Sequence, residues 1–347
     1  MLALVGLGVQ GVKSMSLEGF EVLKESDIVF VDGYTTCIPE NFVEELKEII
    51  KKDVILIFER KRIEEQADKI LEEARNKNVS LTVLGDPLFA TTHLALILEC
   101  KKRNIPYKVV HNNSIACILM NSFGLHSYKF GKIATIVRHS GTPATTVYFT
   151  LYENLIKKLH TIFLLEYDVE SKEGVTPNDA FKTLKEAEDI YKLGAFSDET
   201  FAIVACRIYR KNEKLYMGKV QELLNVDFGP PPYSLIIPSD LHFIEKEALK
   251  VLFNLGEVEI NNSKFLKKRV GYLIDKYVRN TKEALKYARE KITEKKFENL
   301  FENIECYLDD AIRFYNLGEE NLAMLSVGYA EGLLDALRFL GILEIKW

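Results

Sequence analysis

Three glycines near the N-terminus have the spacing found in dinucleotide-binding loops. The first apolar run ends in Gly6-Leu7-Gly8-Val9-Gln10-Gly11, and Asp32 ends the second apolar run 21 residues after Gly11. In a dinucleotide site, backbone amides and a helix N-terminus face the pyrophosphate, and the acid binds a ribose hydroxyl. NAD binding is therefore the first chemistry that the sequence suggests.

The helix after these glycines is expected to begin too late for a pyrophosphate turn. A dinucleotide site needs a helix that starts within the glycine segment, because the third glycine lets that helix pack closely on the strand. Ser16 is the better N-cap, since Leu17, Phe20 and Leu23 form an amphipathic pattern after it. Seven residues separate Gly8 from Ser16, which makes the loop too long for this purpose.

Gly6 and Gly8 nevertheless end the first strand in a sharp turn. Two glycines at such a turn leave room for a ligand to approach the backbone closely. The alternative interpretation is a tight turn at the strand end that binds no ligand. A dinucleotide stays open only if the helix starts about two to four residues before Ser16. We therefore expect a ligand of another kind at this strand end.

A second polar break follows the fourth apolar run. Residues 85–93 have the sequence Gly-Asp-Pro-Leu-Phe-Ala-Thr-Thr-His and precede a helical pattern. Pro87 has no amide hydrogen and Gly85 permits unusual backbone angles, so the strand should break sharply there. This break offers Asp86 at the carboxyl end of the strand.

The next strand ends in the same way. Residues 111–115, His-Asn-Asn-Ser-Ile, place polar side chains before a helix expected over 116–122. Either Asp86 or Ser114 alone would be interpreted as an ordinary helix cap. Two such ends on successive strands, close to the glycine loop, favour a ligand site.

These motifs need a sheet that brings strand ends together. From residue 2 to about 125, short β-branched runs alternate with helical patterns. The runs expected as strands are 2–5, 28–31, 54–57, 79–84 and 107–110. Such alternation predicts an α/β domain, residues 1–125, with a mostly parallel Rossmann-like sheet and ligand chemistry at the carboxyl ends of its strands.

Residues 126–255 alternate less strictly. Strands are expected at 132–137, 161–166, 200–206 and 233–238, and helices around 176–192 and 241–252. Residues 211–220 are typical of a turn into an edge strand, so this part predicts a mixed sheet. We expect a second α/β domain that completes a cleft with the first.

Residues 256–347 are nearly pure helix and contain no proline. Two apolar helix faces are predicted: Val270, Leu273, Tyr277, Leu285, Ala288 and Ile292, and Leu322, Leu325, Tyr329, Leu333, Ala336 and Leu340. Residues 264–296 hold twelve Lys/Arg against four Asp/Glu, whereas residues 297–347 hold three against ten. We expect a three-helix appendage whose basic helix lies along acidic neighbours, in preference to a nucleic-acid patch.

The composition bounds the remaining classes. The 347 residues exceed the roughly 100 to 200 of one domain, and 47% hydrophobic with 28% charged residues excludes disordered and fibrous proteins. A net charge of −5 gives no footprint for nucleic acid. No apolar run approaches the roughly 18 residues that span a bilayer, and the N-terminus lacks the features of a secretory signal. We expect a cytoplasmic protein without membrane contact.

The cysteines predict neither disulfides nor a metal site. They stand singly, with no Cys-x-x-Cys pair and no Cys/His cluster, at Cys37, Cys100, Cys117, Cys206 and Cys306. Buried apolar thiols are the expected state. The histidines at element ends, His93, His111, His160 and His242, are likewise expected to be structural.

On these motifs the chain resembles archaeal diphthine synthase over about residues 1–252. The matching segments are Gly6-Leu7-Gly8, Ser16-Leu17-Glu18-Gly19, Asp27-Ile28-Val29-Phe30, Tyr34-Thr35-Thr36, residues 85–93, residues 111–115, Tyr128-Lys129-Phe130-Gly131-Lys132, Leu159-His160-Thr161, Asp227-Phe228-Gly229 and Leu241-His242-Phe243-Ile244-Glu245. The segment at 85–93 is specific to this family, whereas the N-terminal glycines are shared by the whole fold. The last part of the chain, around 329–338, resembles a small archaeal helical domain of unknown function.

The resemblance implies a two-domain tetrapyrrole-methylase fold and a homodimer that uses S-adenosylmethionine. It implies that the methyl acceptor is the amine of a modified histidine on elongation factor 2. The implied cofactor contacts are Val9, Asp86, Phe89, Ser114, Ile115, Leu165, Ile208 and Tyr233. No metal ligand and no direct contact with nucleic acid is implied, and no catalytic residue is identified.

Three segments depart from the family's pattern. Gln10–Ser14 lacks the carboxylate that the family usually has after its first glycines, the stretch Val137–Thr142 differs, and Tyr233 stands where family members carry histidine. Because these loops border the cleft in the family, the departures bear on the substrate more than on the cofactor.

Methyl transfer from a sulfonium needs an in-line nucleophile and exclusion of water more than a strong acid or base. An amine acceptor must lose a proton, which we expect water or a cleft carboxylate to receive, and we expect Asp86 to contact the polar end of the cofactor. Two alternatives stay open: the same fold acting on ribosomal RNA or a tetrapyrrole, and a non-catalytic adaptor whose helical appendage binds a partner.

Overall fold

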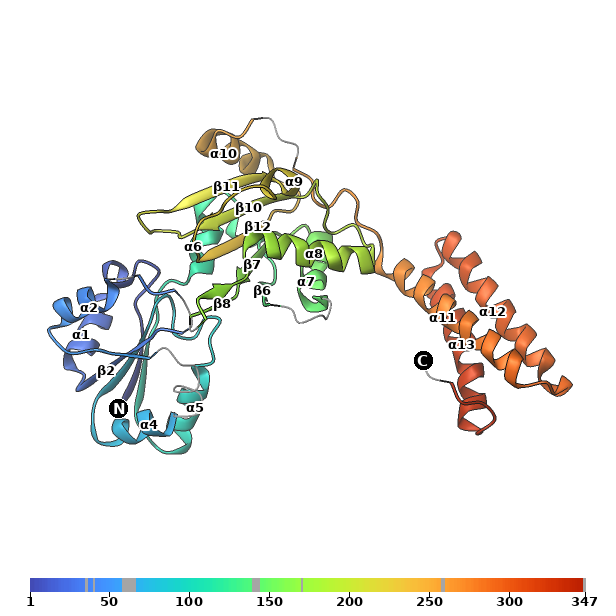
Figure 1. Ribbon diagram of the computed structural model, residues 1–347, viewed down its shortest axis with the longest axis horizontal. Helices are drawn as coiled ribbons and strands as arrows, with labels where there is room; N and C mark the ends of the chain where they lie inside the picture. Colours follow the sequence, from blue (N-terminus) through green and yellow to red (C-terminus); the bar gives the residue numbers. More distant parts are fainter. Residues whose placement is uncertain are drawn as a thin grey trace. The chain divides into compact units, whose positions relative to one another are not determined.

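The computed structural model describes residues 1–34, 37–39, 41–57, 67–138, 144–169, 171–256 and 260–345 (Figure 1). The chain forms two compact units, one of residues 1–187 and 195–264 and the other of residues 188–194 and 265–347. The domain limits expected at 125 and 255 stay a prediction. Thr35 and Thr36, and most of the stretch Val137–Thr142, lie outside the described residues.

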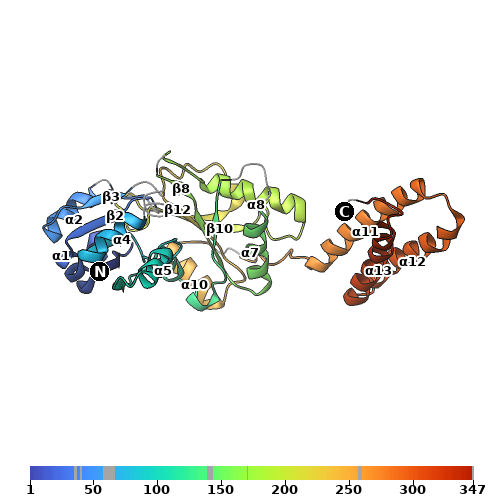
Figure 2. The same cartoon turned by 90° about the horizontal axis from the view of Figure 1, so that it is seen from below.

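The N-terminal half of the first unit is a parallel five-stranded sheet between two layers of helices (Figure 2). Its order is β3-β2-β4-β1-β5, and every neighbouring pair is parallel. The strands are β1 (Leu2–Gly6), β2 (Ile28–Asp32), β3 (Ile55–Ile57), β4 (Val79–Val83) and β5 (Tyr107–Val110). The helices are α1 (Leu17–Glu25) and α2 (Phe42–Ile50) on one face, and α4 (Ala67–Asn76) and α5 (Leu94–Lys102) on the other.

The strand order explains why the polar motifs meet. β1 lies between β4 and β5, with Gly6 opposite Val83 and Val5 opposite Val110. Five buried apolar or small residues in β1 suit a strand that is covered on both faces. The carboxyl ends of β1, β4 and β5 therefore share one edge, where a doubly wound sheet binds its ligands.

The second half of this unit is a mixed sheet in the order β11-β10-β12-β7-β6. Its strands are β6 (Ala134–Ile136), β7 (Thr161–Leu165), β10 (Phe201–Cys206), β11 (Lys214–Lys219) and β12 (Tyr233–Ile237). All pairs are antiparallel except β6 with β7, and β11 is an edge strand, as predicted. Its helices are α6 (Ile115–Ser122), α7 (Thr145–Ile156), α8 (Pro177–Tyr191), α9 (Val220–Leu223) and α10 (Phe243–Phe253).

Helix α7, the short helix α9 and one hairpin of this half escaped the sequence reasoning. Helix α7 is buried on most sides, so its sequence lacks an amphipathic period. The hairpin of β8 (Tyr167–Asp168) and β9 (Glu173–Gly174) is too short to leave a pattern. The predicted fold class, with a parallel sheet, a mixed sheet and C-terminal helices, is confirmed.

A buried carboxylate ties α10 to the mixed sheet. Glu245 is fully buried and accepts hydrogen bonds from His160 Nε2 at 2.9 Å and Lys129 Nζ at 2.6 Å. The backbone N–H groups of His126 and His242 each donate to it at 2.7 Å. The side chain of His160 is therefore structural, as predicted, and the His242 side chain caps α10 by accepting from Ile244 N at 3.4 Å.

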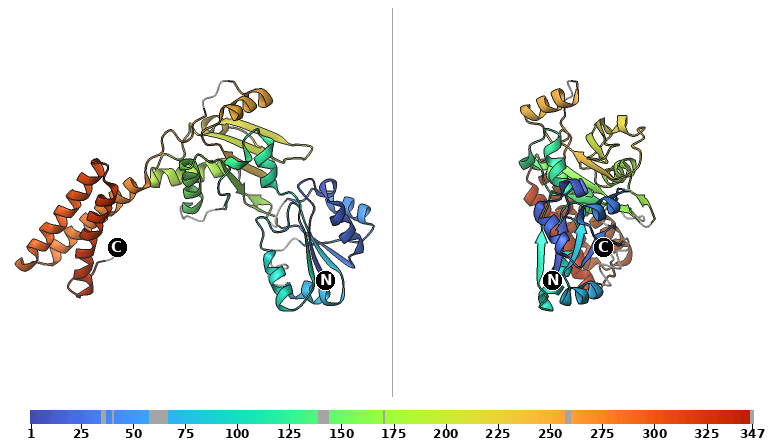
Figure 3. Two further views of the ribbon diagram at one scale, coloured as in Figure 1. Left: turned by 180° about the vertical axis from the view of Figure 1, so that it is seen from behind. Right: turned by 90° about the vertical axis from the view of Figure 1, so that its left-hand side faces the viewer.

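The second unit contains α11 (Arg269–Lys291), α12 (Glu298–Asn316) and α13 (Glu320–Phe339), which pack around a common apolar core (Figure 3). Acidic side chains of α12 and α13 pair with basic ones of α11 and the residue before it. Arg289 lies 3.5 Å from Glu298 and 3.0 Å from Glu305, and Lys268 lies 2.6 Å from Glu320. The predicted pairing of the basic helix with acidic neighbours is confirmed.

The predicted apolar face of α13 is wrong by about one residue. Leu322, Leu325 and Tyr329 are between 42% and 56% exposed. The buried residues of this helix are Ala323, Ser326, Val327, Ala330, Leu334 and Leu337. Small alanines on the inner face let the helices approach closely, and a helix that is apolar on most sides does not reveal by spacing which side is covered.

The cysteine prediction holds only in part. Cys100 and Cys206 are buried, but Cys117 and Cys306 are exposed and Cys37 is half-buried. A single cysteine in a helical pattern takes whichever side its position gives it, and residue type alone does not decide that. Among the described residues, no helix has the length and apolarity needed to cross a membrane.

Candidate functional site

The first glycine loop is closed by protein atoms. Gly8 and Gly85 form a reciprocal backbone pair, with Gly8 N donating to Gly85 O at 3.1 Å and Gly85 N to Gly8 O at 3.0 Å. A Cβ at Gly6 would lie 2.8 Å from Gly85 O, and one at Gly8 would lie 2.5 Å from Asn113 Oδ1. The expectation that Gly6 and Gly8 leave room for a ligand is therefore wrong, because neighbouring loops fill that room.

Gly85, in contrast to Gly6 and Gly8, has open space beside its backbone. Gly85 has φ +95°, and a Cβ there would meet only Ser114 Cα, at 3.9 Å. The positive φ favours glycine at this position, and the lack of close neighbours leaves the backbone accessible. The surface that a ligand can approach closely is thus the backbone after β4.

The geometry does not support a dinucleotide. Helix α1 begins at Leu17, and its N-cap Ser16 accepts a hydrogen bond from Gly19 N at 3.0 Å, as predicted. Asp32 is fully buried, and its carboxylate lies 3.5 Å from His93 Nε2 and accepts from Tyr34 N at 2.9 Å. An acid in this environment cannot bind a ribose hydroxyl.

Two asparagines after β5 hold the loop that follows β1. Asn112 Nδ2 donates to Gly6 O at 3.1 Å and to Ser14 O at 3.0 Å. Val9 N donates to Asn113 Oδ1 at 3.3 Å. The sequence reasoning noted these asparagines only as polar residues, whereas they fix the segment Gln10–Ser14 beside the site.

Asp86 lines the site, but protein donors already surround its carboxylate. Leu88 N donates to Oδ1 at 2.9 Å, while His111 Nδ1 and Asn112 N lie 2.8 Å and 3.2 Å from Oδ2. Burial raises the pKa of Asp86, but these hydrogen bonds outweigh burial and the pKa is lowered. Asp86 is therefore an ionised anchor that joins the loops after β4 and β5.

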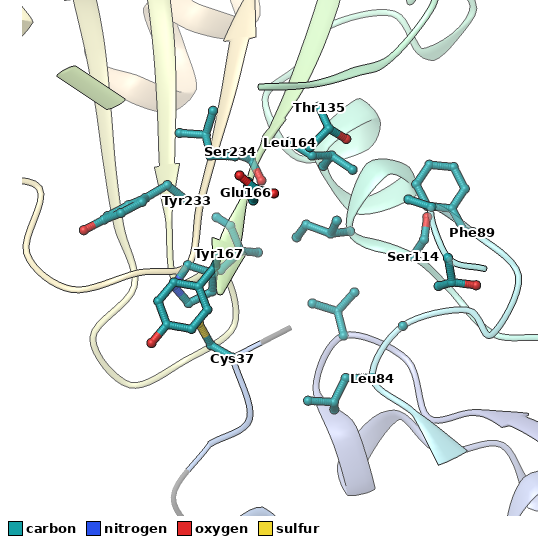
Figure 4. Close-up of a pocket in the computed structure, with 18 of the residues that line it drawn as sticks. Cys37, Leu84, Phe89, Ser114, Thr135, Leu164, Glu166, Tyr167, Tyr233 and Ser234 are labelled. Atoms are coloured by element: carbon teal, nitrogen blue, oxygen red, sulfur yellow. The ribbon is translucent and has the colours of Figure 1, made fainter. Parts of the chain in front are cut away.

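Ser114 occupies the N-cap of α6 without acting as a cap. Its hydroxyl makes no capping bond and instead lies 3.6 Å from Cys117 Sγ. The interpretation of Ser114 as an ordinary helix cap is therefore wrong. Its side chain faces the cavity described next (Figure 4).

A cavity of about 790 Å³ opens between the two sheets of the first unit. Its lining includes every residue that the family resemblance implied as a cofactor contact: Val9, Asp86, Phe89, Ser114, Ile115, Leu165, Ile208 and Tyr233. These residues come from strand ends and loops of both sheets (Figure 4). The structure thus brings the eight predicted positions together, although they span more than 220 residues of sequence.

Tyr233 contributes its ring more than its hydroxyl. The hydroxyl donates to the carbonyl of Gly229, and burial raises the pKa of this phenol. In Figure 4 the ring extends along the wall of the cavity, and the hydroxyl lies at its far end. A hydrogen bond from this hydroxyl to a ligand would have to replace the one to Gly229.

Further polar residues of the cavity were missed. Cys37 and Tyr167 lie next to each other, and burial raises the pKa of the Cys37 thiol to about 11, so it stays protonated at neutral pH. Glu166 Oε2 accepts from Arg138 N at 2.8 Å. Arg210 follows β10 and also lines the cavity. A run of cations after a predicted strand was the signal that could have revealed Arg210.

The described part of the chain contains no group of three or more His, Cys, Asp or Glu side chains placed to hold a metal ion. The polar atoms around the cavity are instead backbone groups, hydroxyls, guanidinium groups and the three carboxylates of Asp86, Glu166 and Asp168. This arrangement suits an organic ligand with both apolar and polar parts.

Comparison with known proteins assigns two parts of the chain to two different families. Residues 1–224 match the Tetrapyrrole (Corrin/Porphyrin) Methylases, and residues 276–343 match a family described as a protein of unknown function. The diphthine synthase of Methanocaldococcus jannaschii is 36% identical over 73% of this chain and 98% of that protein. The diphthine methyl ester synthase of Dictyostelium discoideum is 32% identical over 71% of this chain and 96% of that protein.

A crystal structure of diphthine synthase superposes with a TM-score of 0.62 at 31% identity, covering 72% of this chain and 94% of that chain. The chain belongs to the tetrapyrrole methylases and, within them, to the diphthine synthase family, with a helical unit of a second family added at its C-terminal end.

Proposed function

We propose that this chain is a diphthine synthase that uses S-adenosylmethionine to methylate a modified histidine of elongation factor 2. Two findings together support this proposal. The alignment with the M. jannaschii diphthine synthase, at 36% identity, covers 98% of the length of that protein. The eight positions expected to hold the methyl donor line one cavity.

The residues of the cavity fit S-adenosylmethionine. A volume of about 790 Å³ is within the usual range for small-molecule sites. Val9, Phe89, Ile115 and Leu165 provide apolar walls, and Gly85 exposes backbone that a flat or bent ligand can approach. When bound, this donor supplies a methyl group on a positively charged sulfur whose leaving thioether is neutral.

The chain's own residues contribute orientation and the exclusion of water. The apolar walls displace water from the acceptor's path, and the loops joined by Asp86 hold the floor of the cavity rigid. A site of this kind needs no catalytic triad, because positioning supplies most of the rate.

An amine acceptor must also release a proton, and of the two cavity carboxylates Asp86 and Glu166 the latter is better suited to receive it. Both oxygens of Asp86 accept hydrogen bonds from the protein, which makes Asp86 a weak base. Glu166 lines the same cavity and, among the described residues, accepts one N–H, at Oε2. We assign Oε1 of Glu166 as the proton acceptor of the proposed reaction.

The acceptor carries two kinds of nucleophile. The resemblance implies an amine, and the Dictyostelium relative is named for a methyl ester, which forms only on a carboxylate. We propose that the acceptor of this chain presents an amine for methylation and a carboxylate beside it.

The experiment is a methyl-transfer assay with purified full-length protein, labelled S-adenosylmethionine and elongation factor 2 that carries the unmethylated precursor. We expect label on the modified histidine and none on factor that lacks the modification. Transfer to ribosomal RNA or to a tetrapyrrole instead would favour another member of the fold.

We also propose that the chain works as a homodimer, as the family resemblance implies. Sedimentation equilibrium of the full chain should give about twice the mass of 39.8 kDa. A single species of monomer mass at micromolar concentration would contradict this.

A further inference from the structure

One cation of the cavity has no role in the proposed donor contacts. Arg210 lies in the turn that follows β10 and lines the cavity on the side of Cys37 and Tyr167. Its guanidinium donates through Nη2 to the carbonyl of Cys37. A guanidinium carries five N–H donors, so one carbonyl leaves most of its bonding capacity directed elsewhere.

Arg210 lacks a counter-charge within the part of the chain that the structure describes. Of the other two guanidinium groups that line the cavity, Arg138 has a carboxylate partner, whereas the buried Arg207 is held by several backbone carbonyls. Arg138 lies 2.5 Å from Glu173, and Arg207 donates to the carbonyls of Asn212 at 3.0 Å and Phe228 at 2.9 Å. Arg210 is half-buried and forms no ion pair with a carboxylate of the described residues, although Glu166 and Asp168 line the same cavity.

The surroundings make this cation costly to hold. Burial lowers the pKa of Arg210, Cys37 partly opposes this effect, and the like charge of the neighbouring Arg207 lowers the pKa again. A half-buried cation without an anion is unfavourable unless an anion arrives with a ligand.

The turn that presents Arg210 is fixed in an unusual backbone. Arg207 has φ +53° and Tyr209 has φ +63°, although neither is glycine. The buried Arg207 side chain holds the turn through its carbonyl partners, and Tyr209 N donates to Glu213 Oε2 at 2.6 Å. Strain of this kind persists only where surrounding contacts impose it, and here it aims Arg210 at the cavity.

We propose that Arg210 binds the carboxylate of a ligand in this cavity. The inference rests on the proposed function, which offers two sources of that group: the amino-acid part of the methyl donor, and the acceptor side chain on elongation factor 2. A guanidinium matches a carboxylate with two parallel hydrogen bonds, so Arg210 is a specificity-determining residue for either source.

Three variants test the assignment: Arg210→Met, which removes the charge, Arg210→Lys, which keeps the charge without the planar fork, and the exposed neighbour Lys211→Met as a matched charge control. Each is titrated calorimetrically with S-adenosylhomocysteine and with 5′-methylthioadenosine, which lacks the amino-acid part. Each is also assayed for the KM of the modified elongation factor 2.

If the donor supplies the carboxylate, Arg210→Met lowers the affinity for S-adenosylhomocysteine by about 10-fold to 100-fold and leaves the affinity for 5′-methylthioadenosine unchanged. If the acceptor supplies it, both titrations are unchanged and the KM for elongation factor 2 rises by a similar factor. In either case Arg210→Lys, which also serves if the methionine variant does not fold, shows a smaller effect, and Lys211→Met shows none.

Two results overturn the inference: no change in any of the three measurements, or an equal loss for both nucleosides, which would indicate general damage to the cavity. A wild-type chain that binds neither nucleoside is a different result, because it contradicts the proposed function and not the role of Arg210 alone.

Discussion

At the scale of single residues, the site depends on groups whose hydrogen bonds are fixed before a ligand arrives. Asp86 is the clearest case, since it bonds two loops through both carboxylate oxygens. Asp86 could be identified from the sequence because Gly85 and Pro87 break the strand and place the acid at its carboxyl end. The sequence reasoning did not identify Arg210, because the cations after β10 were not interpreted as a signal and because the left-handed residues that fix this turn have no sequence signature.

Replacing Asp86 by Asn should weaken donor binding without unfolding the chain. The amide oxygen can still accept from Leu88 N, but the NH₂ group cannot accept from His111 or Asn112 N. We expect the affinity for S-adenosylhomocysteine to fall by about 10-fold, which corresponds to the loss of one or two charged hydrogen bonds. Calorimetric titration checks this, and an unchanged affinity would remove Asp86 from the site.

Replacing Glu166 by Gln should separate chemistry from binding. The amide cannot receive a proton, so we expect kcat to fall by about 10² at neutral pH, with the affinity for S-adenosylhomocysteine unchanged. The rate of the variant should rise with pH more steeply than that of the wild type, as solvent takes over the proton. A variant with wild-type kcat across pH 6–9 would show that Glu166 is not the acceptor.

At the scale of elements, two glycines that pair with each other should respond differently to alanine. Gly8→Ala places a Cβ 2.5 Å from Asn113 Oδ1, at φ +72°, so it should destabilise the loops of β1 and β5. Gly85→Ala meets no atom closer than 3.9 Å, so its cost should be about 1–2 kcal/mol of backbone strain.

Urea denaturation measures the first effect and calorimetric titration the second. Gly85→Ala should remain folded and lose donor affinity, since its methyl group points into open space beside Ser114. A Gly85→Ala variant with wild-type affinity would contradict the assignment of this backbone to the ligand.

The hydrogen bonds of Glu245 should make the stability of the mixed sheet depend on pH in the acid range. Burial raises the pKa of Glu245, but the bonds from His160, Lys129 and two backbone N–H groups outweigh it and hold the pKa well below its ordinary value of 4.5. A lowered pKa contributes stability above the unfolded value, and that stability is lost as the pH falls through the folded one. Wild-type stability should therefore decrease below about pH 4.5.

Glu245→Ala should cost about 3–5 kcal/mol at pH 7, because it leaves Lys129 and His160 without their buried acceptor. Glu245→Gln should cost less and should flatten the acid dependence. Urea titrations at pH 3.5, 4.5 and 7 test this, and a variant with the wild-type acid profile would refute the role of Glu245.

The elements themselves were largely predictable, and the exceptions have physical causes. β1, β2 and β4 are mostly buried apolar runs and β5 ends in two valines, and such runs predict strands at nearly the observed residues. Helix α7 and the covered side of α13 were missed, because a helix surrounded by protein or apolar on most sides loses its period.

At the scale of the whole molecule, the cavity belongs entirely to the first unit. Every lining residue lies within residues 1–187 or 195–264, and the second unit has its own apolar core. Sequence patterns could place the cavity only through the family resemblance, because its eight expected positions come from distant strand ends.

Ile304→Ala should therefore destabilise the second unit and leave donor binding intact. Ile304 is fully buried in the core of α11, α12 and α13, so its truncation should cost about 2–4 kcal/mol. Differential scanning calorimetry should show one transition at lower temperature, while the affinity for S-adenosylhomocysteine stays at the wild-type value. A parallel loss of affinity would show that the two units are coupled.

The most direct measurement is mass spectrometry of elongation factor 2 after incubation with the full-length protein and isotope-labelled S-adenosylmethionine. We predict mass added in labelled methyl groups at the modified histidine, dependent on both the protein and the prior modification. Unlabelled factor from a reaction in which the protein binds S-adenosylhomocysteine normally would contradict the proposed function.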